Sequence, residues 1–111
     1  MNKNEIQLDL LKRLESNPGY TQRELSQELG VSLGKINYCI SKLTKKGFVK
    51  LTNFKNNPHK AGYAYFLTPK GIEEKGNLTI SFLKSKIEEY EILKDEISKL
   101  KEDTAKIEKY E

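Results

Sequence analysis

The sequence predicts a mainly α-helical protein that contains one small β-hairpin and ends in a long helix. Apolar residues recur every three or four positions in three short segments within the first 46 residues. Between residues 48 and 67 the apolar period falls to two, which is typical of strands. From Pro69 onward no further proline occurs and the only glycines are Gly71 and Gly76, so one helix can run to the end.

Composition limits the size and the class of the protein. The 111 residues, 36% of them hydrophobic, suffice for one modest domain plus an extension. A single cysteine rules out an internal disulfide, and no apolar run is long enough to cross a bilayer. Since residues 1–5 also lack the apolar region of a signal peptide, we expect a soluble, cytoplasmic protein without a membrane partner.

The first predicted helix has one apolar face. Asn4 can cap this helix, and the sequence Asn17-Pro18-Gly19 stops it. Its apolar residues follow helical spacing: Ile6, Leu10, Leu11 and Leu14. This face has to be buried against the rest of the domain.

Two further helices joined by a tight turn are predicted next. Thr21 and Glu24 have the spacing of a capping box, and the short helix that they start ends at Gly30, a residue suited to a left-handed backbone. Ser32 can cap the next helix, which ends at Gly47. The apolar face of that helix holds Ile36, Ile40 and Leu43. Two helices joined by a turn of about four residues with a glycine form a helix-turn-helix.

A β-hairpin is predicted to follow the third helix. Its first strand alternates, with Phe48, Lys50, Thr52 and Phe54 on one side and Val49, Leu51 and Asn53 on the other. A polar loop over residues 55–62 leads to a second strand over residues 63–67. Pro58 argues against a ladder that continues through the tip. A hairpin after a helix-turn-helix makes the predicted domain a winged helix.

The last helix carries the pattern of a coiled coil. Thr68 can cap it, and Pro69 suits its first position. The apolar residues of the seam follow one another in alternating steps of three and four residues. A step of three from Tyr90 to Leu93, where four is due, is a stammer that shifts the seam around the helix. The predicted dimerisation residues follow the seam: Ile80, Leu83, Ile87, Tyr90, Leu93, Ile97, Leu100 and Ile107. We therefore predict a winged-helix domain over residues 1–70 and a dimerisation helix over residues 71–111.

Charge points to a polyanionic partner. No Asp or Glu occurs between Glu28 and Glu73, although the chain holds 16 acidic residues. Residues 1–77 hold 13 basic and 7 acidic side chains (+6), whereas residues 78–111 hold 7 and 9 (−2). A basic, acid-free surface on a winged helix favours binding to nucleic acid.

The predicted contacts to double-stranded DNA lie in three segments. The second helix of a helix-turn-helix enters the major groove, and the preceding helix reaches the phosphate backbone. The wing tip can lie along a minor groove or its phosphates. The candidates are Gln22, Arg23, Ser32, Leu33, Gly34, Lys35, Asn37, Tyr38, Ser41, Lys42, Lys55, Asn56, Asn57, His59 and Lys60. The alternative is that the helix pair is a structural corner with solvated lysines and that the wing tip is a polar loop.

Other chemistry has little support in the sequence. Cys39 shares a helix face with Ile36 and Leu43, so we expect a buried, inert thiol rather than an oxidant sensor. His59 has no second His or Cys at ligand spacing, which argues against a metal site. No phosphate-binding loop and no nucleophile with a nearby base occur, so we expect neither catalysis nor a cofactor.

The residues also resemble a known family. The sequence TQRELSQELGVSLGKINYCISKLTKKGFVK over residues 21–50, followed by GYAYFLTPKGIEEK, is similar to the MarR-type winged-helix regulators. The likeness covers roughly residues 5–100. More narrowly, the sequence is similar to a short branch of these regulators that is associated with exopolysaccharide synthesis genes. It implies a DNA-binding transcriptional regulator, with residues 32–42 reading the groove and residues 55–60 forming the wing. MarR-type proteins usually have a longer N-terminal helical region and two C-terminal helices, which this chain lacks.

The long last helix leaves two functional hypotheses open. It can fold back on the first helix alone, but it is longer than one small domain can cover, so we expect it to pair with a second copy. An antiparallel or crossed homodimer would present two recognition helices to half-sites on one face of DNA. The alternative is an adaptor whose last helix binds a different protein. The sequence does not identify a small-molecule effector.

Overall fold

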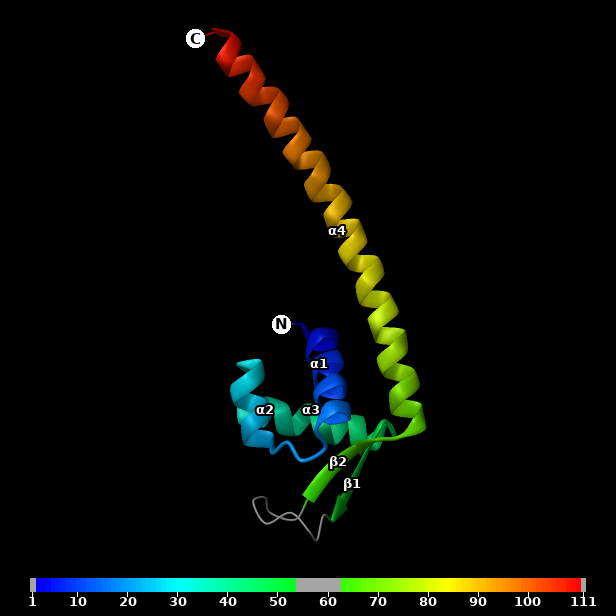
Figure 1. Cartoon of the computed structure of the whole chain (residues 1–111). Helices are drawn as coiled ribbons and strands as arrows, with labels where there is room; N and C mark the ends of the chain where they lie inside the picture. Colours follow the sequence, from blue (N-terminus) through cyan, green and yellow to red (C-terminus); the bar gives the residue numbers. More distant parts are fainter. Residues whose placement is uncertain (1, 54–62, 111) are drawn as a thin grey trace. The chain divides into compact units, whose positions relative to one another are not determined.

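The computed structural model describes residues 2–53 and 63–110. Within them the chain forms α1 (Lys3–Ser16), α2 (Gln22–Leu29), α3 (Leu33–Lys45), β1 (Val49–Asn53), β2 (Tyr63–Leu67) and α4 (Pro69–Tyr110) (Figure 1). This order of elements confirms the predicted fold class, a mainly helical winged helix-turn-helix followed by a long helix. The chain divides into two compact units, Met1–Thr79 and Ile80–Glu111, so the first turns of α4 belong to the winged-helix unit.

Local hydrogen bonds explain where most helices begin and end. Thr21 and Glu24 form the predicted capping box, and Gly30 takes the left-handed conformation (φ 68°) that closes α2. The predicted cap of α1 was wrong by two residues. Asn2, rather than Asn4, caps α1, because its side-chain oxygen accepts a hydrogen bond from the Glu5 backbone N–H at 2.9 Å.

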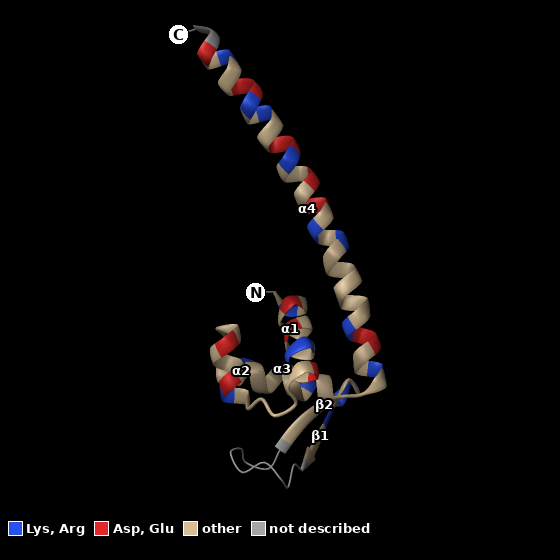
Figure 2. Cartoon of the chain, viewed as in Figure 1, with Lys and Arg blue, Asp and Glu red and all other residues tan. Residues whose placement is uncertain are grey.

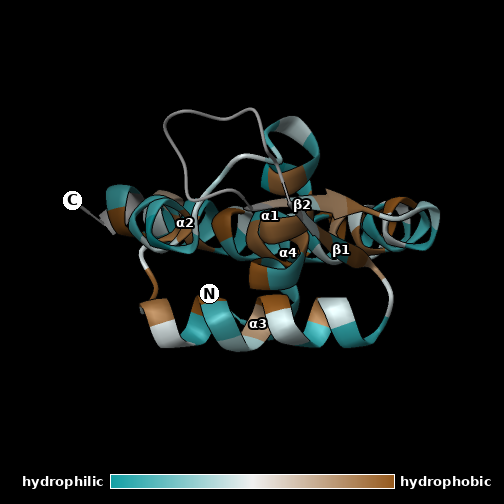
Figure 3. Cartoon of the chain, turned by 90° about the horizontal axis from the view of Figure 1, so that it is seen from below, coloured by the Kyte–Doolittle hydropathy of each residue, from teal (hydrophilic) through white to brown (hydrophobic). Residues whose placement is uncertain are grey.

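One apolar core holds the first unit together. It contains the predicted apolar faces of α1 and α3 together with side chains from α2 and the wing. Its buried members are Ile6, Leu10, Leu11, Leu14, Leu25, Ile36, Ile40, Leu43, Phe48 and Val49. The core therefore contacts only one side of α3, and the opposite side of this helix faces solvent (Figure 3).

The wing strands pair in antiparallel register, with Val49 opposite Leu67 and Leu51 opposite Tyr65. Phe48, which was predicted within the strand, precedes β1 and is buried in the core. The alternation of the sequence does not translate into alternating burial, because Leu51 remains 47% exposed. The two-stranded sheet has too few neighbours to cover both of its faces.

A tight junction joins the end of α3 to the start of α4. The Thr68 backbone N–H donates to the Phe48 carbonyl oxygen at 3.0 Å, and the Thr68 hydroxyl donates to the Gly47 carbonyl oxygen. The same hydroxyl accepts from the Gly71 N–H at 3.0 Å, as expected for a helix cap. The Lys70 ammonium donates to the Lys46 carbonyl oxygen at 3.1 Å. These contacts fix the end of α3, the wing and the start of α4 in position relative to one another.

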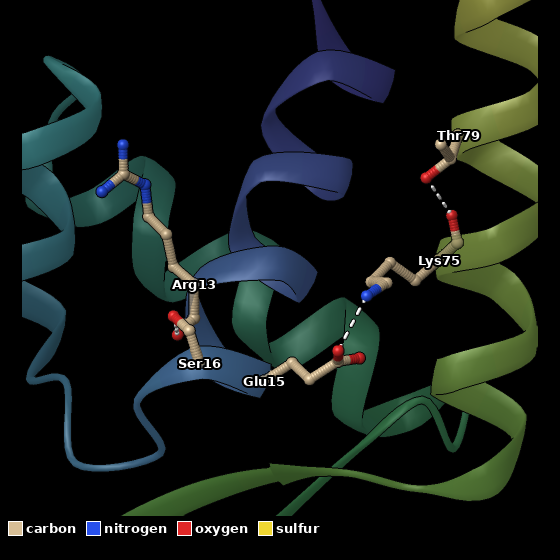
Figure 4. A network of polar contacts seen from close by, with 5 residues as sticks. All are labelled: Arg13, Glu15, Ser16, Lys75 and Thr79. Atoms are coloured by element: carbon tan, nitrogen blue, oxygen red, sulfur yellow. Dashed lines mark hydrogen bonds and ion pairs between the residues drawn. The ribbon is translucent and has the colours of Figure 1, made fainter.

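Two ion pairs on the surface link α1 to its neighbours, and Figure 4 shows the one between Glu15 and Lys75. Lys75 on α4 contacts Glu15 on α1 with 2.8 Å between Nζ and Oε1, and Arg13 pairs with Glu28 on α2. Because these side chains are partly exposed, each pair adds little to stability, about 0–1 kcal/mol. The apolar core, and not these pairs, sets the packing of α1.

Candidate nucleic-acid interface

The structure leaves most of the predicted recognition residues of α3 exposed to solvent. The Ser32 hydroxyl caps the helix by accepting from the Lys35 backbone N–H at 3.1 Å. Apolar residues at positions 36, 40 and 43 turn one side of the helix into the core, which leaves the other side uncovered. The exposed candidates are Ser32, Leu33, Gly34, Lys35, Asn37, Tyr38 and Ser41, whereas Lys42 is half-buried.

This exposed surface is polar and contains no acidic residue (Figure 2). Leu33 is 44% exposed and Tyr38 is 57% exposed, so both present apolar surface that a base edge or sugar can contact. The Ser41 hydroxyl donates to Asn37 Oδ1 at 3.3 Å, which holds these two predicted contacts together. A Cβ added at Gly34 would meet no described atom within 4 Å. The surface at Gly34 is therefore open to close approach by a ligand.

A basic groove lies beside this surface, between the start of α1 and α3. It has a volume of about 350 Å³. Its walls carry four lysines and no acid: the lining residues are Lys3, Asn4, Ile6, Gln7, Lys35, Tyr38, Cys39, Lys42, Leu43 and Lys46. A lining that combines four lysines with apolar side chains and holds no acid is suited to bind an anion.

The lysines of this groove repel one another. A side-chain hydrogen bond with Lys42, reinforced by repulsion between the two positive charges, lowers the pKa of Lys3. The same contact, together with a hydrogen bond to Tyr38, raises the pKa of Lys42. The Lys42 ammonium also lies 5.4 Å from the centre of the Tyr38 ring. A polyanion in the groove would relieve this repulsion.

Cys39 is less buried than the sequence predicts, although it packs against the core. The thiol is half-buried and lines the basic groove, although its neighbours Ile36 and Leu43 are in the core. Cys39 lies three positions after Ile36, so it sits at the edge of the apolar face and not at its centre. The start of α1 leaves this edge uncovered.

Other predicted site residues have different surroundings. Gln22 is half-buried and its Nε2 donates to the Tyr65 hydroxyl at 3.1 Å, which connects α2 to the wing. Arg23 is exposed at the start of α2. The predicted wing-tip residues, Lys55, Asn56, Asn57, His59 and Lys60, lie outside the described residues.

Lys3 is a groove residue that sequence analysis missed. The sequence predicts a helix that starts after Asn4, which places Lys3 before the first helix although within the domain. The signal was present in Asn2, whose side chain can cap a helix with Glu5 in its first turn. A cap two residues earlier places Lys3 at the first helical position, next to the recognition helix.

The described residues offer little sign of other sites. Within residues 2–53 and 63–110 no group of three His, Cys, Asp or Glu side chains could hold a metal ion. The helices in this part of the chain are too polar or too short to cross a membrane. The exposed α3 surface and the adjoining basic groove are the candidate interface.

Comparisons with known proteins agree with this geometry. A family described as winged helix-turn-helix DNA-binding matches residues 3–50. The curated proteins include no significant sequence match. Among solved structures, the transcriptional regulator SlyA is 21% identical with a TM-score of 0.60, over 72% of this chain and 55% of that one.

Two further structures match in the same way. Streptococcus pneumoniae FabT, solved in complex with DNA, is 23% identical with a TM-score of 0.55, over 75% of this chain and 56% of that one. A MarR transcriptional regulator from Methanosarcina mazei is 28% identical with a TM-score of 0.52, over 67% of this chain and 52% of that one. The chain thus spans little more than half the length of these proteins. Residues 3–50 match the winged helix-turn-helix DNA-binding family, and the fold of the chain is that of the MarR-family transcriptional regulators.

Proposed function

We propose that the protein is a homodimeric transcriptional regulator that binds specific double-stranded DNA. In this role α3 lies in the major groove, and the wing lies on the flanking minor groove or backbone. The observation that carries the proposal is the exposed surface of α3, which is acid-free and adjoins a groove with four lysines. Such a surface on the second helix of a helix-turn-helix is suited to base edges and phosphates.

The residues of the interface divide into two roles. Asn37 and Lys35 can pair with base edges, since an amide suits adenine and an ammonium suits guanine. The other three lysines of the groove, Lys3, Lys42 and Lys46, are assigned to backbone phosphates, which an ammonium group binds as a point charge. Phosphate contacts fix the position of the helix, and base contacts supply the specificity.

The solved relatives support a DNA-binding role. FabT was solved in complex with DNA, and a MarR protein from E. coli, 26% identical with a TM-score of 0.54, was solved with operator DNA. These proteins share the winged-helix fold of this chain. The narrower resemblance to the exopolysaccharide-associated branch remains a prediction, and the DNA next to the gene is the natural first probe for an operator.

The proposed dimer rests on the unpaired seam of α4. All eight predicted seam residues are between 44% and 64% exposed in the single chain. A helix of 42 residues with such a row of large apolar side chains needs a partner to bury it. A second copy also supplies the second recognition helix that a two-fold operator requires.

Two single charge-reversal variants of this protein, compared with each other, test the proposal. Lys35→Glu places an acid on the α3 surface, and we expect binding to duplex DNA to weaken by about tenfold or more. Lys99→Glu is the matched control, because Lys99 is 73% exposed on α4 and its Nζ lies 3.2 Å from Asp95 within the same helix. Fluorescence anisotropy with a labelled upstream duplex measures both. Equal loss in the two variants would contradict a binding site on α3.

A second candidate function is an adaptor that binds a different protein through α4. The same exposed seam favours it, since a seam can pair with any helix of matching pattern. Sedimentation of the pure protein separates the two candidates. A dimer supports the regulator, and a monomer that fails to bind duplex DNA supports the adaptor.

A further inference from the structure

We propose that the α4 helices of two copies pair side by side in the same direction, as a parallel two-stranded coiled coil. The inference rests on the homodimer of the proposed function and deepens it by assigning the geometry of the interface. It follows from the register of the seam after the stammer, from the charges beside the seam and from a hollow in its surface.

The register after the stammer is regular from Leu93 to Ile107. With Leu93, Leu100 and Ile107 at position d of the heptad, Ile97 and Thr104 fall at position a. Both a residues are β-branched and two of the three d residues are leucine. β-Branched residues at a with leucine at d favour two parallel strands over higher assemblies.

Thr104 can be buried in such an interface. Its hydroxyl donates to the Leu100 carbonyl oxygen of the same helix at 2.9 Å. The polar hydrogen is therefore satisfied without water, and the methyl group remains available for packing. A single polar a position is compatible with a dimer.

The residues beside the seam discriminate between the two directions. After the stammer, positions e are Lys94, Lys101 and Glu108, and positions g are Glu96 and Asp103. Before it, with Ile87 at a and Tyr90 at d, Lys86 is at g and Glu91 is at e. In a parallel pair each g residue faces the e residue five positions later on the partner, whereas in an antiparallel pair g faces g and e faces e.

Parallel pairing brings opposite charges together. After the stammer, Glu96 faces Lys101 of the partner subunit, while Asp103 opposite Glu108 of the partner subunit is the one repulsive pair. Before the stammer, Lys86 faces Glu91 of the partner subunit in the same way. After the stammer, antiparallel pairing would instead place the acidic g residues, Glu96 and Asp103, opposite acidic g residues. Charge complementarity therefore selects the parallel direction.

A hollow in the seam has the shape that this pairing needs. It has a volume of about 340 Å³ and is lined by Tyr90, Leu93, Lys94, Ile97, Ser98 and Lys101. Its floor is the seam itself, and its edge carries the two e-position lysines. An apolar side chain of the second copy fills such a hole in a coiled coil, and Glu96 of the partner subunit then meets Lys101 at its edge. Both winged-helix domains consequently join the same end of the coil.

Disulfide trapping tests the direction of pairing. In a Cys39→Ala background, Leu93→Cys and Ile107→Cys each place one thiol in the seam, and Lys99→Cys places it outside the seam as a control. Sedimentation first establishes that each variant is dimeric, and circular dichroism establishes that it is helical. Under mild oxidation we expect Leu93→Cys and Ile107→Cys each to form a linked dimer at least tenfold faster than Lys99→Cys.

The outcomes test the direction of helix pairing separately from the formation of the dimer. A dimer that links only when Leu93→Cys is mixed with Ile107→Cys is antiparallel and overturns the proposal. A dimer in which neither variant links faster than the control overturns it as well. A monomer overturns both the coil and the proposed homodimer, and anisotropy with duplex DNA on the same samples reports separately on DNA binding.

Discussion

Replacing Gly71 by alanine tests the junction that joins the recognition helix, the wing and α4. A Cβ added at Gly71 would lie 2.0 Å from the carbonyl oxygen and 2.9 Å from the carbonyl carbon of Phe48. Ordinary van der Waals contact of a Cβ begins at about 3.4 Å. The start of α4 or the backbone of Phe48 therefore has to move by more than about an ångström. The 3.0 Å hydrogen bond from the Thr68 N–H to the same oxygen would be lost or lengthened.

The size of the effect follows from three terms. Overpacking costs about 1–3 kcal/mol. Loss of the hydrogen bond adds about 0.5–1.5 kcal/mol. The better helix propensity of alanine returns at most about 1 kcal/mol. The net destabilisation is about 0.5–4.5 kcal/mol, and a central value of about 2 kcal/mol lowers the Tm of a domain of this size by roughly 10 °C.

Gly76→Ala is the matched control on the same helix. A Cβ at Gly76 would meet nothing within 4 Å, so the substitution keeps only the gain in helix propensity, up to about 1 kcal/mol. Thermal unfolding followed by circular dichroism, at one protein concentration, compares the two variants. We expect Gly71→Ala to melt below the wild type and Gly76→Ala at or above it. Equal melting of the two variants would show that α4 does not approach Phe48 in this way.

Two further substitutions separate DNA binding from stability. Gly34→Ala adds a methyl group to open space on the α3 surface, so the Tm should hold or rise slightly, while anisotropy should show weaker DNA binding if the backbone of DNA approaches there. A variant that binds DNA as the wild type does would remove Gly34 from the interface. Lys3→Gln relieves repulsion against Lys42, so thermal unfolding should show no loss of stability, while anisotropy should show reduced affinity for duplex DNA. Unchanged affinity would place the phosphates away from the basic groove.

Much of the fold could be predicted because its local signals are strong. The capping box at Thr21, the glycine that closes α2 and the Ser32 cap each combine a residue type with a fixed spacing, and the structure contains all three. The apolar positions of α1 and α3 repeat at helical spacing, and they form the core. These features depend on neighbours within four residues of sequence, where spacing alone determines contact.

The remaining features depend on contacts that are distant in sequence. The half-burial of Cys39 and the groove around Lys3 result from how far α1 covers the edge of α3, which no local pattern specifies. The bond between Gln22 and Tyr65 joins residues that are 43 positions apart. The close approach of Gly71 to Phe48 is also a tertiary contact, and the sequence shows only a glycine early in a helix. The wing-tip contacts remain predictions.

The salt dependence of DNA affinity tests the central claim most directly. The basic groove and α3 together offer five lysines per subunit, at positions 3, 35, 42, 45 and 46. If a dimer makes about eight phosphate contacts, the logarithm of its association constant should fall with a slope of about −7 against the logarithm of salt concentration. Affinity should then drop by about 10⁴-fold between 50 and 200 mM salt. An affinity that stays flat over this range would contradict a DNA-binding surface built from these lysines.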